Sequence, residues 1–198
     1  MAKLTESWNA YLASLSNALT GTSATGPVAE VLDVDEAFER WVRLTHEVHE
    51  AGGRIYFAGN GGSAAIASHM AADLSKNGSL RATAFNDASF LTAISNDLAF
   101  DDVFSLPLRL NGRPGDLLIS ISSSGNSPNI VRALEAARDI GIHAVTLSGK
   151  GADNRSRALG ELNFYVPADR YGWVESAHQV VVHHWFDQYL NLHRDGAL

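Results

Sequence analysis

The sequence predicts an α/β fold: a three-layer α-β-α sandwich with a five-stranded parallel sheet and additional N-terminal helices. Short strands rich in apolar and β-branched residues alternate with helical patterns along the chain, which is typical of a parallel sheet with right-handed crossovers. Two of these strands run directly into loops rich in glycine or serine. Such loops lie beyond the carboxyl ends of the strands, where ligands bind in open parallel sheets.

Length and composition predict one globular domain over residues 1–198, with a helical extension at 1–52 and an α/β core at 53–198. The chain is 45% hydrophobic and has a formal net charge of −7. This charge argues against a nucleic-acid partner and against an anionic membrane surface. No cysteine is present, so disulfide and thiolate chemistry are excluded, and no apolar run is long enough for a membrane span. We therefore expect a cytoplasmic protein.

Two helical patterns precede the first strand. Residues 1–19 place Trp8, Leu12 and Leu15 along one apolar stripe, and the pattern resumes from Val34 to Glu50 after a break rich in small residues. Helices that precede the first strand are expected to lie outside the sheet. There they either cover a sheet edge or build a subunit contact, and the sequence leaves both alternatives open.

The first strand, Arg54–Ala58, enters a glycine-rich turn at Gly59–Ser63. Such a turn allows close backbone approach, although it lacks the spacing of a dinucleotide-binding fingerprint. In the following helix, from Ala64 to about Lys76, His69 and Asp73 lie four residues apart and share one face. A lone helical histidine is usually structural, but the carboxylate and the nearby glycine loop make a functional site an equally good interpretation.

The sequence is organised around the strand that starts at Leu117 and the serine-rich loop Ser122–Ser127 that follows it. Pro128 can occupy the first position of the next helix, with Ser127 as its N-cap. A helix N-terminus, hydroxyl donors and a glycine together suit an anion. We interpret the loop as a phosphate site rather than a polar turn. No P-loop lysine accompanies it, which favours a sugar phosphate over a nucleotide triphosphate.

The remaining strands are predicted at Ala82–Phe85, His143–Ser148 and Leu162–Val166. Asp97 follows an apolar run and either contacts a ligand or caps the next segment. The last helix, from about Gly172 to Asn191, carries a polar row at successive i+4 steps. Its members are Glu175, Gln179, His183 and Asp187. Such a row is usually a solvated face, but Glu175 and His183, together with His69 and Asp73, can supply oxygen and nitrogen ligands to a zinc-like ion.

Four motifs carry a family resemblance. They are GNGGSAAIASHMAAD (59–73), LTAISND (91–97), ISSSGNS (121–127) and VESAHQVVVH (174–183). They resemble the motifs of sugar isomerase (SIS) domains, which have a flavodoxin-like or Rossmann-like sheet. More narrowly, the chain resembles bacterial phosphoheptose isomerases over almost its whole length.

The resemblance implies an enzyme that interconverts sedoheptulose 7-phosphate and D-glycero-D-manno-heptose 7-phosphate through a cis-enediol. It also implies zinc as the cofactor and a homotetramer whose active site is shared between subunits. By this resemblance, the residues that bind the sugar phosphate are Asn60, Gly61, Ser63, Asp97, Ser122, Ser123, Ser124 and Ser127. The implied zinc ligands are His69, Asp73, Glu175 and His183, of which Asp73, Glu175 and His183 are also the candidate catalytic groups.

Three positions depart from the family pattern. Asp73 stands where the family has a glutamate that serves as ligand and base, Glu175 where it has a glutamine ligand, and Trp173 where it has an arginine. A carboxylate in place of a neutral amide adds negative charge beside the metal. Asp73 is one methylene shorter than that glutamate, which shortens the reach of its carboxylate toward the substrate carbon. Whether Asp73 or Glu175 is the base stays open at this point.

Two other functions remain as alternatives. One is a SIS protein without catalytic activity that binds a phosphosugar or a replication-initiator protein. The other is an isomerase or epimerase of a related sugar phosphate in secondary metabolism. Because His69, His183 and carboxylates at the other two ligand positions are retained, an enzyme is favoured over the binding protein.

Overall fold

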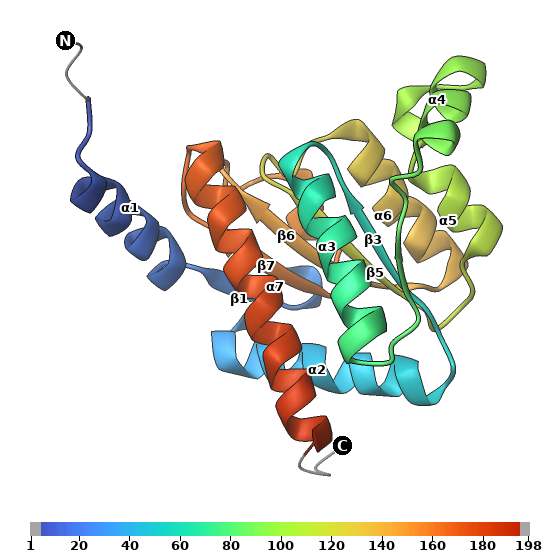
Figure 1. The fold of residues 1–198 in the computed structure, drawn as a ribbon, viewed down its shortest axis with the longest axis horizontal. Coiled ribbons are helices and arrows are strands. Elements are labelled where there is room, and N and C mark those ends of the chain that lie inside the picture. The colour runs from blue at the N-terminus through green and yellow to red at the C-terminus, as the bar shows by residue number, and fades with distance from the viewer. Residues whose placement is uncertain (1–4, 195–198) are drawn as a thin grey trace.

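A seven-stranded sheet in the order β2-β1-β7-β6-β5-β3-β4 separates two helical layers (Figure 1). The computed structural model describes residues 5–194, and the start of the predicted first helix, residues 1–4, lies outside them. The strands are β1 Ser23–Thr25, β2 Val31–Leu32, β3 Ile55–Gly59, β4 Ala82–Ala84, β5 Leu117–Ser122, β6 His143–Gly149 and β7 Leu162–Val166. The α-helices are α1 Trp8–Thr20, α2 Val34–Glu50, α3 Gly62–Asn77, α4 Ala88–Asp97, α5 Ser105–Asn111, α6 Pro128–Ile140 and α7 Tyr171–Arg194. Short 3₁₀ helices span Pro27–Ala29, Phe100–Asp102 and Arg155–Ala158.

The alternation of side chains along β3 shows how the sheet is covered. Ile55 and Phe57 are buried against α2, α3 and α7, whereas Tyr56 and Ala58 are buried against α4, α5 and α6. Successive residues of a strand point to opposite faces, so a strand covered on both faces is apolar throughout. This arrangement confirms the predicted three-layer α-β-α sandwich.

All five predicted parallel strands are present, and β3 through β7 pair in parallel. The sheet is wider than predicted, because β1 and β2 add an antiparallel pair beside β7. These strands consist of only three and two residues, too few for an alternating pattern to stand out. They lie within the segment predicted to be a helical extension. The assignment of one domain with a boundary at residue 52 stays a prediction.

The two leading helices have different environments. Trp41 of α2 stacks on Trp185 of α7 with ring centroids 4.3 Å apart, and both are fully buried. Helix α2 therefore packs on one face of the sheet. The expectation that it would lie outside the sheet was wrong. Helix α1 lies apart from the sheet and contacts α7 (Figure 1), where Tyr11 packs on Trp173. Among residues 5–194, none of the helices combines the length with the apolar composition that a membrane span needs.

Candidate active site

The serine-rich loop lines a cavity of about 120 Å³ at the carboxyl end of β5. The residues around it are Asn60, Ser63, Ile121, Ser122, Ser123, Ser124, Ser127, Tyr171 and Glu175. A cavity of this size admits a phosphate group but not a whole sugar phosphate, since sites that enclose drug-sized ligands measure roughly 300–1,000 Å³. The cavity brings together every serine that the sequence analysis assigned to the phosphate.

The hydroxyl groups of the loop remain able to donate to an anion. Ser122 Oγ accepts a hydrogen bond from the Gly125 N–H, and Ser124 Oγ accepts one from the Asn126 N–H, each at 3.2 Å. A hydroxyl that accepts one hydrogen bond still has its own proton to donate. Ser127 is the N-cap residue of α6, as predicted, but its side chain makes no capping hydrogen bond. These groups are available to the oxygens of a phosphate.

Residues that follow β6 hold the serine-rich loop in position by contacts with Gly125. The carbonyl of Gly125 accepts hydrogen bonds from the backbone N–H and the hydroxyl of Ser156, at 2.9 and 2.8 Å. Gly125 has φ +63°, and a Cβ there would overlap the side-chain oxygen of Asn154. The close approach and the left-handed backbone both require glycine at this position.

We expect Gly125→Ala to destabilise the fold by about 2–4 kcal/mol, the sum of the left-handed backbone cost and overpacking against Asn154. Gly115→Ala is the matched control, because Gly115 has φ +86° but nothing lies within 4 Å of its Cβ position. The control should lose only about 1–2 kcal/mol. Urea unfolding of the two variants measures the difference. Equal losses would contradict the close packing on Asn154.

A pair of amides joins the glycine-rich loop to the first turn of α6, which directly follows the serine-rich loop. Asn60 and Asn129 exchange reciprocal hydrogen bonds of 2.9 Å. Gly61 has φ +57° and is the N-cap residue of α3, and Ser63 in the first turn of this helix is buried in the cavity wall. The N-terminal ends of α3 and α6 therefore both border the cavity, and each adds the positive end of a helix dipole.

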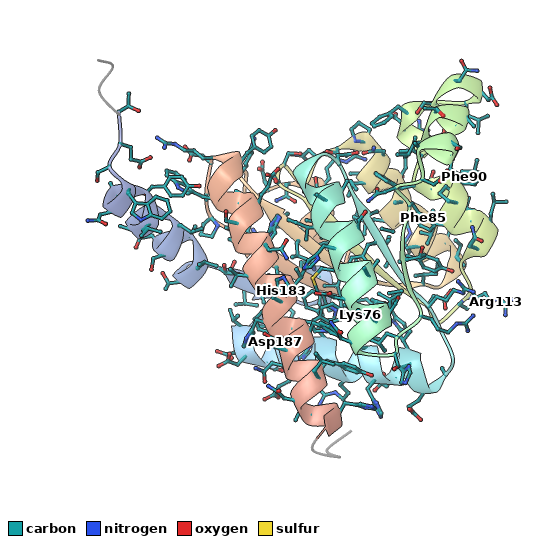
Figure 2. The ribbon with its side chains drawn as sticks, in the orientation of Figure 1. Lys76, Phe85, Phe90, Arg113, His183 and Asp187 are labelled. Carbon is teal, nitrogen blue, oxygen red and sulfur yellow. The ribbon has the colours of Figure 1, made fainter. Side chains whose placement is uncertain are left out.

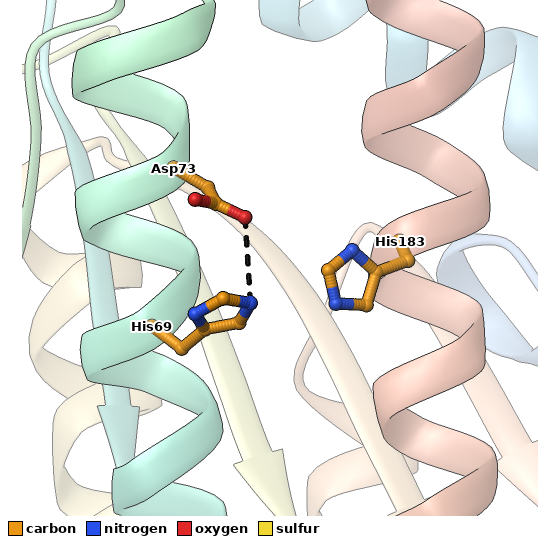
Figure 3. A group of neighbouring side chains, drawn as sticks. All are labelled: His69, Asp73 and His183. Atoms are coloured by element: carbon orange, nitrogen blue, oxygen red, sulfur yellow. Dashed lines mark ion pairs between the residues drawn. The ribbon is translucent and has the colours of Figure 1, made fainter.

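Figure 2 shows His183 on α7. A second cluster lies between α3 and α7 and consists of His69, Asp73 and His183 (Figure 3). The distance from His69 Nε2 to Asp73 Oδ2 is 3.3 Å, and one ligand atom from each of the three residues lies within 4.8 Å of the others. Ligand atoms about 2.1 Å from a tetrahedral ion lie roughly 3.4 Å apart. The cluster therefore fits a metal ion after a small movement of His183.

Two predicted site residues lie apart from this cluster. Glu175 lines the serine cavity, and its two carboxylate oxygens lie 2.5 and 2.8 Å from the position that a Cβ on Gly62 would occupy. Asp97 is the last residue of α4, is exposed, and accepts a hydrogen bond from Asn96. It is not among the residues that line the cavity. The roles of Glu175 and Asp97 stay predictions.

The structure adds residues that the sequence analysis did not assign to the site. Tyr171, at the start of α7, forms part of the cavity wall. Lys150 Nζ lies 3.2 Å from the centroid of the Tyr171 ring, so a cation lies beside the wall even though none lies in the serine loop itself. The sequence did offer a signal that Lys150 lies near the site. Lys150 directly follows β6, and the carboxyl end of β6 lies at the same edge of the sheet as the serine loop.

His178 lies in the same motif as His183 but has a different environment. Its ring is fully buried, which lowers its pKa to about 4, and Nε2 donates to the carbonyl of Ser148 at 3.1 Å. His178 is therefore a neutral structural residue. Because the unfolded chain binds the proton more readily, the contribution of His178 to stability falls as the pH drops from about 6.5 toward 4.

Comparisons with known proteins agree with this geometry. The family model described as "SIS domain" matches residues 28–149. The phosphoheptose isomerase of Akkermansia muciniphila is 41% identical over 151 residues, which are 73% of this chain and 79% of that protein. The phosphoheptose isomerase of Paramagnetospirillum magneticum is 38% identical over 161 residues, which are 78% of this chain and 83% of that protein.

Solved structures give the same result. Phosphoheptose isomerase GmhA from Neisseria gonorrhoeae matches with a TM-score of 0.73 and 36% identity, covering 78% of this chain and 85% of that one. A phosphoheptose isomerase from Francisella tularensis matches with a TM-score of 0.80 and 25% identity, covering 92% and 95%. The chain therefore belongs to the phosphoheptose isomerase family of SIS-domain proteins.

Proposed function

We propose that this protein interconverts sedoheptulose 7-phosphate and D-glycero-D-manno-heptose 7-phosphate, an aldose–ketose isomerisation through a cis-enediol. The observation that carries the proposal is the separation between the serine cavity and the His69–Asp73–His183 cluster. His69 lies six positions after Ser63 on α3, and His183 lies eight positions after Glu175 on α7. These steps correspond to roughly 9 and 12 Å along the helix axes.

That separation suits a seven-carbon sugar phosphate. With single bonds of about 1.5 Å, an extended heptose places C1 roughly 9 Å from the phosphorus on C7. A phosphate held by the serine loop would then bring C1 and C2 to the cluster, where the chemistry takes place. The serine loop would contribute orientation, and the cluster would contribute the reacting groups.

The chain's own residues supply the proton transfers. In the direction from ketose to aldose, a carboxylate removes a proton from C1 and returns it to C2. The proton of the C1 hydroxyl moves to the C2 oxygen, with His183 as the acid/base group. Zinc held by His69, Asp73 and His183 would polarise the oxygens on C1 and C2.

The proposal is tested by turnover of a panel of seven-carbon and six-carbon sugar phosphates, with and without added zinc. Sedoheptulose 7-phosphate should be the best substrate, and its C1 proton should exchange with solvent during turnover. Preferred turnover of another sugar phosphate would instead support an isomerase of secondary metabolism. Binding without turnover of any member of the panel would support the non-catalytic alternative.

Ser124→Ala tests the phosphate site. Loss of one donor to a charged group should weaken substrate binding by about 1–3 kcal/mol. The reason is that Ser124 lines the cavity and its hydroxyl oxygen accepts a hydrogen bond from the Asn126 N–H, which leaves the hydroxyl proton free to donate to a ligand. Calorimetry with the phosphorylated sugar measures the loss, and the same sugar without its phosphate is the control. Equal losses for both ligands would contradict a phosphate contact.

We also propose a homotetramer of dihedral symmetry. Trp8 and Leu12 on α1 are 68% and 40% exposed, and an exposed apolar stripe of this kind is typical of a subunit interface. Light scattering should show four subunits, and Trp8→Ser should weaken the assembly. A fully active monomer would contradict a shared active site. A cytoplasmic location and the absence of nucleic-acid partners stay predictions.

A further inference from the structure

A second cavity, of about 440 Å³, lies at the amino end of the sheet and is lined by Arg54, Arg81, Arg113 and Asp116. Its volume falls within the range of about 300–1,000 Å³ that is typical of small-molecule sites. The serine cavity lies at the other end of the sheet. Strand β5 joins the two ends, since it begins directly after Asp116 and its last residue is Ser122. Six residues of a strand span roughly 20 Å, so the two cavities are separate sites.

The pairing of β3 with β4 brings Arg54 and Arg81 together. Each arginine directly precedes its strand, and the first residues of the two strands, Ile55 and Ala82, are partners in register. Both guanidinium charges act on the hydroxyl of Tyr56. Burial raises the pKa of this hydroxyl above its ordinary value, and the charges of Arg54 and Arg81 each oppose that shift. The two guanidinium groups therefore lie near the same hydroxyl group.

Asp116 anchors the segments that carry Arg54 and Arg113. Its two carboxylate oxygens accept hydrogen bonds of 2.8 Å, one from the backbone N–H of Arg54 and one from that of Arg113. Figure 2 shows Arg113 in the loop between α5 and β5. The guanidinium of Arg81 donates to the carbonyl of Gly52 at 2.6 Å, which leaves most of its N–H donors for a ligand. The cavity is thus bordered by anchored segments.

The charge of this cavity is positive and uncompensated. Among residues 5–194, none of its three guanidinium groups forms an ion pair with a carboxylate. The arginines that do form such pairs are Arg40, Arg109, Arg132, Arg138, Arg155 and Arg170. Three guanidinium groups and the carboxylate of Asp116 give the cavity a formal charge of +2, in a chain whose net charge is −7. The planar fork of a guanidinium matches the oxygens of a phosphate in geometry as well as in charge.

We propose that this cavity binds a phosphate ester that carries an apolar organic group. A phosphate monoester has about 1.5–2 negative charges at pH 7, which balances the charge of the cavity, whereas a single carboxylate would not. Leu110, which is 66% exposed, and Pro114 line the same cavity. They offer the organic group an apolar surface beside the arginines. The site is distinct from the serine loop and from the cluster of His69, Asp73 and His183.

The test is an NMR titration of the full ¹⁵N-labelled chain with phenyl phosphate and, separately, with inorganic phosphate. The glycine amides that report this cavity are Gly52, Gly53, Gly112 and Gly115. The amide of Gly125 reports the serine loop, so the two sites are read separately even though an anion can bind to each. Phenyl phosphate should shift the four glycine signals with a lower Kd than inorganic phosphate. Arg54→Gln and Arg81→Gln should each raise that Kd at least about tenfold and leave the response of Gly125 unchanged.

Arg43→Gln is the matched control. Arg43 is exposed, forms no ion pair with a carboxylate of residues 5–194 and lies outside the cavity, so its replacement removes the same charge and should leave the Kd nearly unchanged. Leu110→Ser should weaken the binding of phenyl phosphate but not that of inorganic phosphate. Unshifted signals of the four glycines would overturn the site, and so would equal losses in Arg43→Gln and Arg81→Gln. Equal affinity for the two ligands, or phenyl phosphate binding that Leu110→Ser leaves unchanged, would overturn the assignment of an ester.

Discussion

His183→Ala is expected to reduce bound zinc from roughly one ion per subunit to a small fraction of that, and to lower turnover by at least about 10²–10⁴-fold. His183 is the only member of the cluster that α7 contributes, whereas His69 and Asp73 both come from α3. Its loss leaves two neighbouring groups on one helix, too few for a stable zinc site. The same substitution removes the proposed acid/base group.

The neighbouring residue provides the control for this experiment. His184 follows His183 on α7, but its ring packs edge-on against Phe38 with centroids 4.6 Å apart. His184→Ala therefore removes an imidazole from the same turn without changing the cluster. Elemental analysis of protein purified without chelator should give wild-type zinc for His184→Ala. Full turnover by wild-type protein stripped of metal would rule out a metal-dependent mechanism.

The elements that the sequence predicted well are those with a strong local signal. The strand Leu117–Ile121 is buried on both faces, and the sequence shows this as a nearly continuous apolar run. Ser127 as the N-cap residue and Pro128 at the first position of α6 mark the start of that helix, as predicted. The strands β1 and β2 were missed because β1 pairs with β7, which is distant in the sequence, and β2 pairs only with β1. Strand propensity depends strongly on such tertiary context.

The candidate site was predicted only in part, for a related reason. The i+4 spacing placed His69 and Asp73 on one face of α3, and the 3.3 Å contact between them confirms this. Their meeting with His183 depends on how α3 packs beside α7, which spacing alone does not determine. The position of Glu175 against Gly62 depends on the free space at a glycine. Sequence patterns give residues and faces, but not the direction in which a long side chain turns.

Asp73 and Glu175 are the two candidates for the base that removes the carbon-bound proton of the substrate. We expect Asp73→Asn to lower turnover by about 10²–10⁴-fold, because the amide keeps the shape of the side chain and loses the base. Asp73 belongs to the cluster at which C1 and C2 are proposed to lie. Phosphate affinity should remain near wild type, because Asp73 does not line the serine cavity. Asp73→Glu, which restores the residue common in the family, should retain activity.

Glu175→Gln is the matched comparison, since it also replaces a carboxylate by an amide of the same shape. Glu175→Gln should lower turnover less than Asp73→Asn does, because the carboxylate of Glu175 lies at the phosphate end of the site. Solvent exchange of the substrate C1 and C2 protons, measured by NMR in both variants, separates chemistry from binding. A larger loss in Glu175→Gln would identify Glu175 as the base. Exchange at the wild-type rate in both variants would exclude both carboxylates and contradict the enediol mechanism with these assignments, because that mechanism requires one of them to remove the carbon-bound proton.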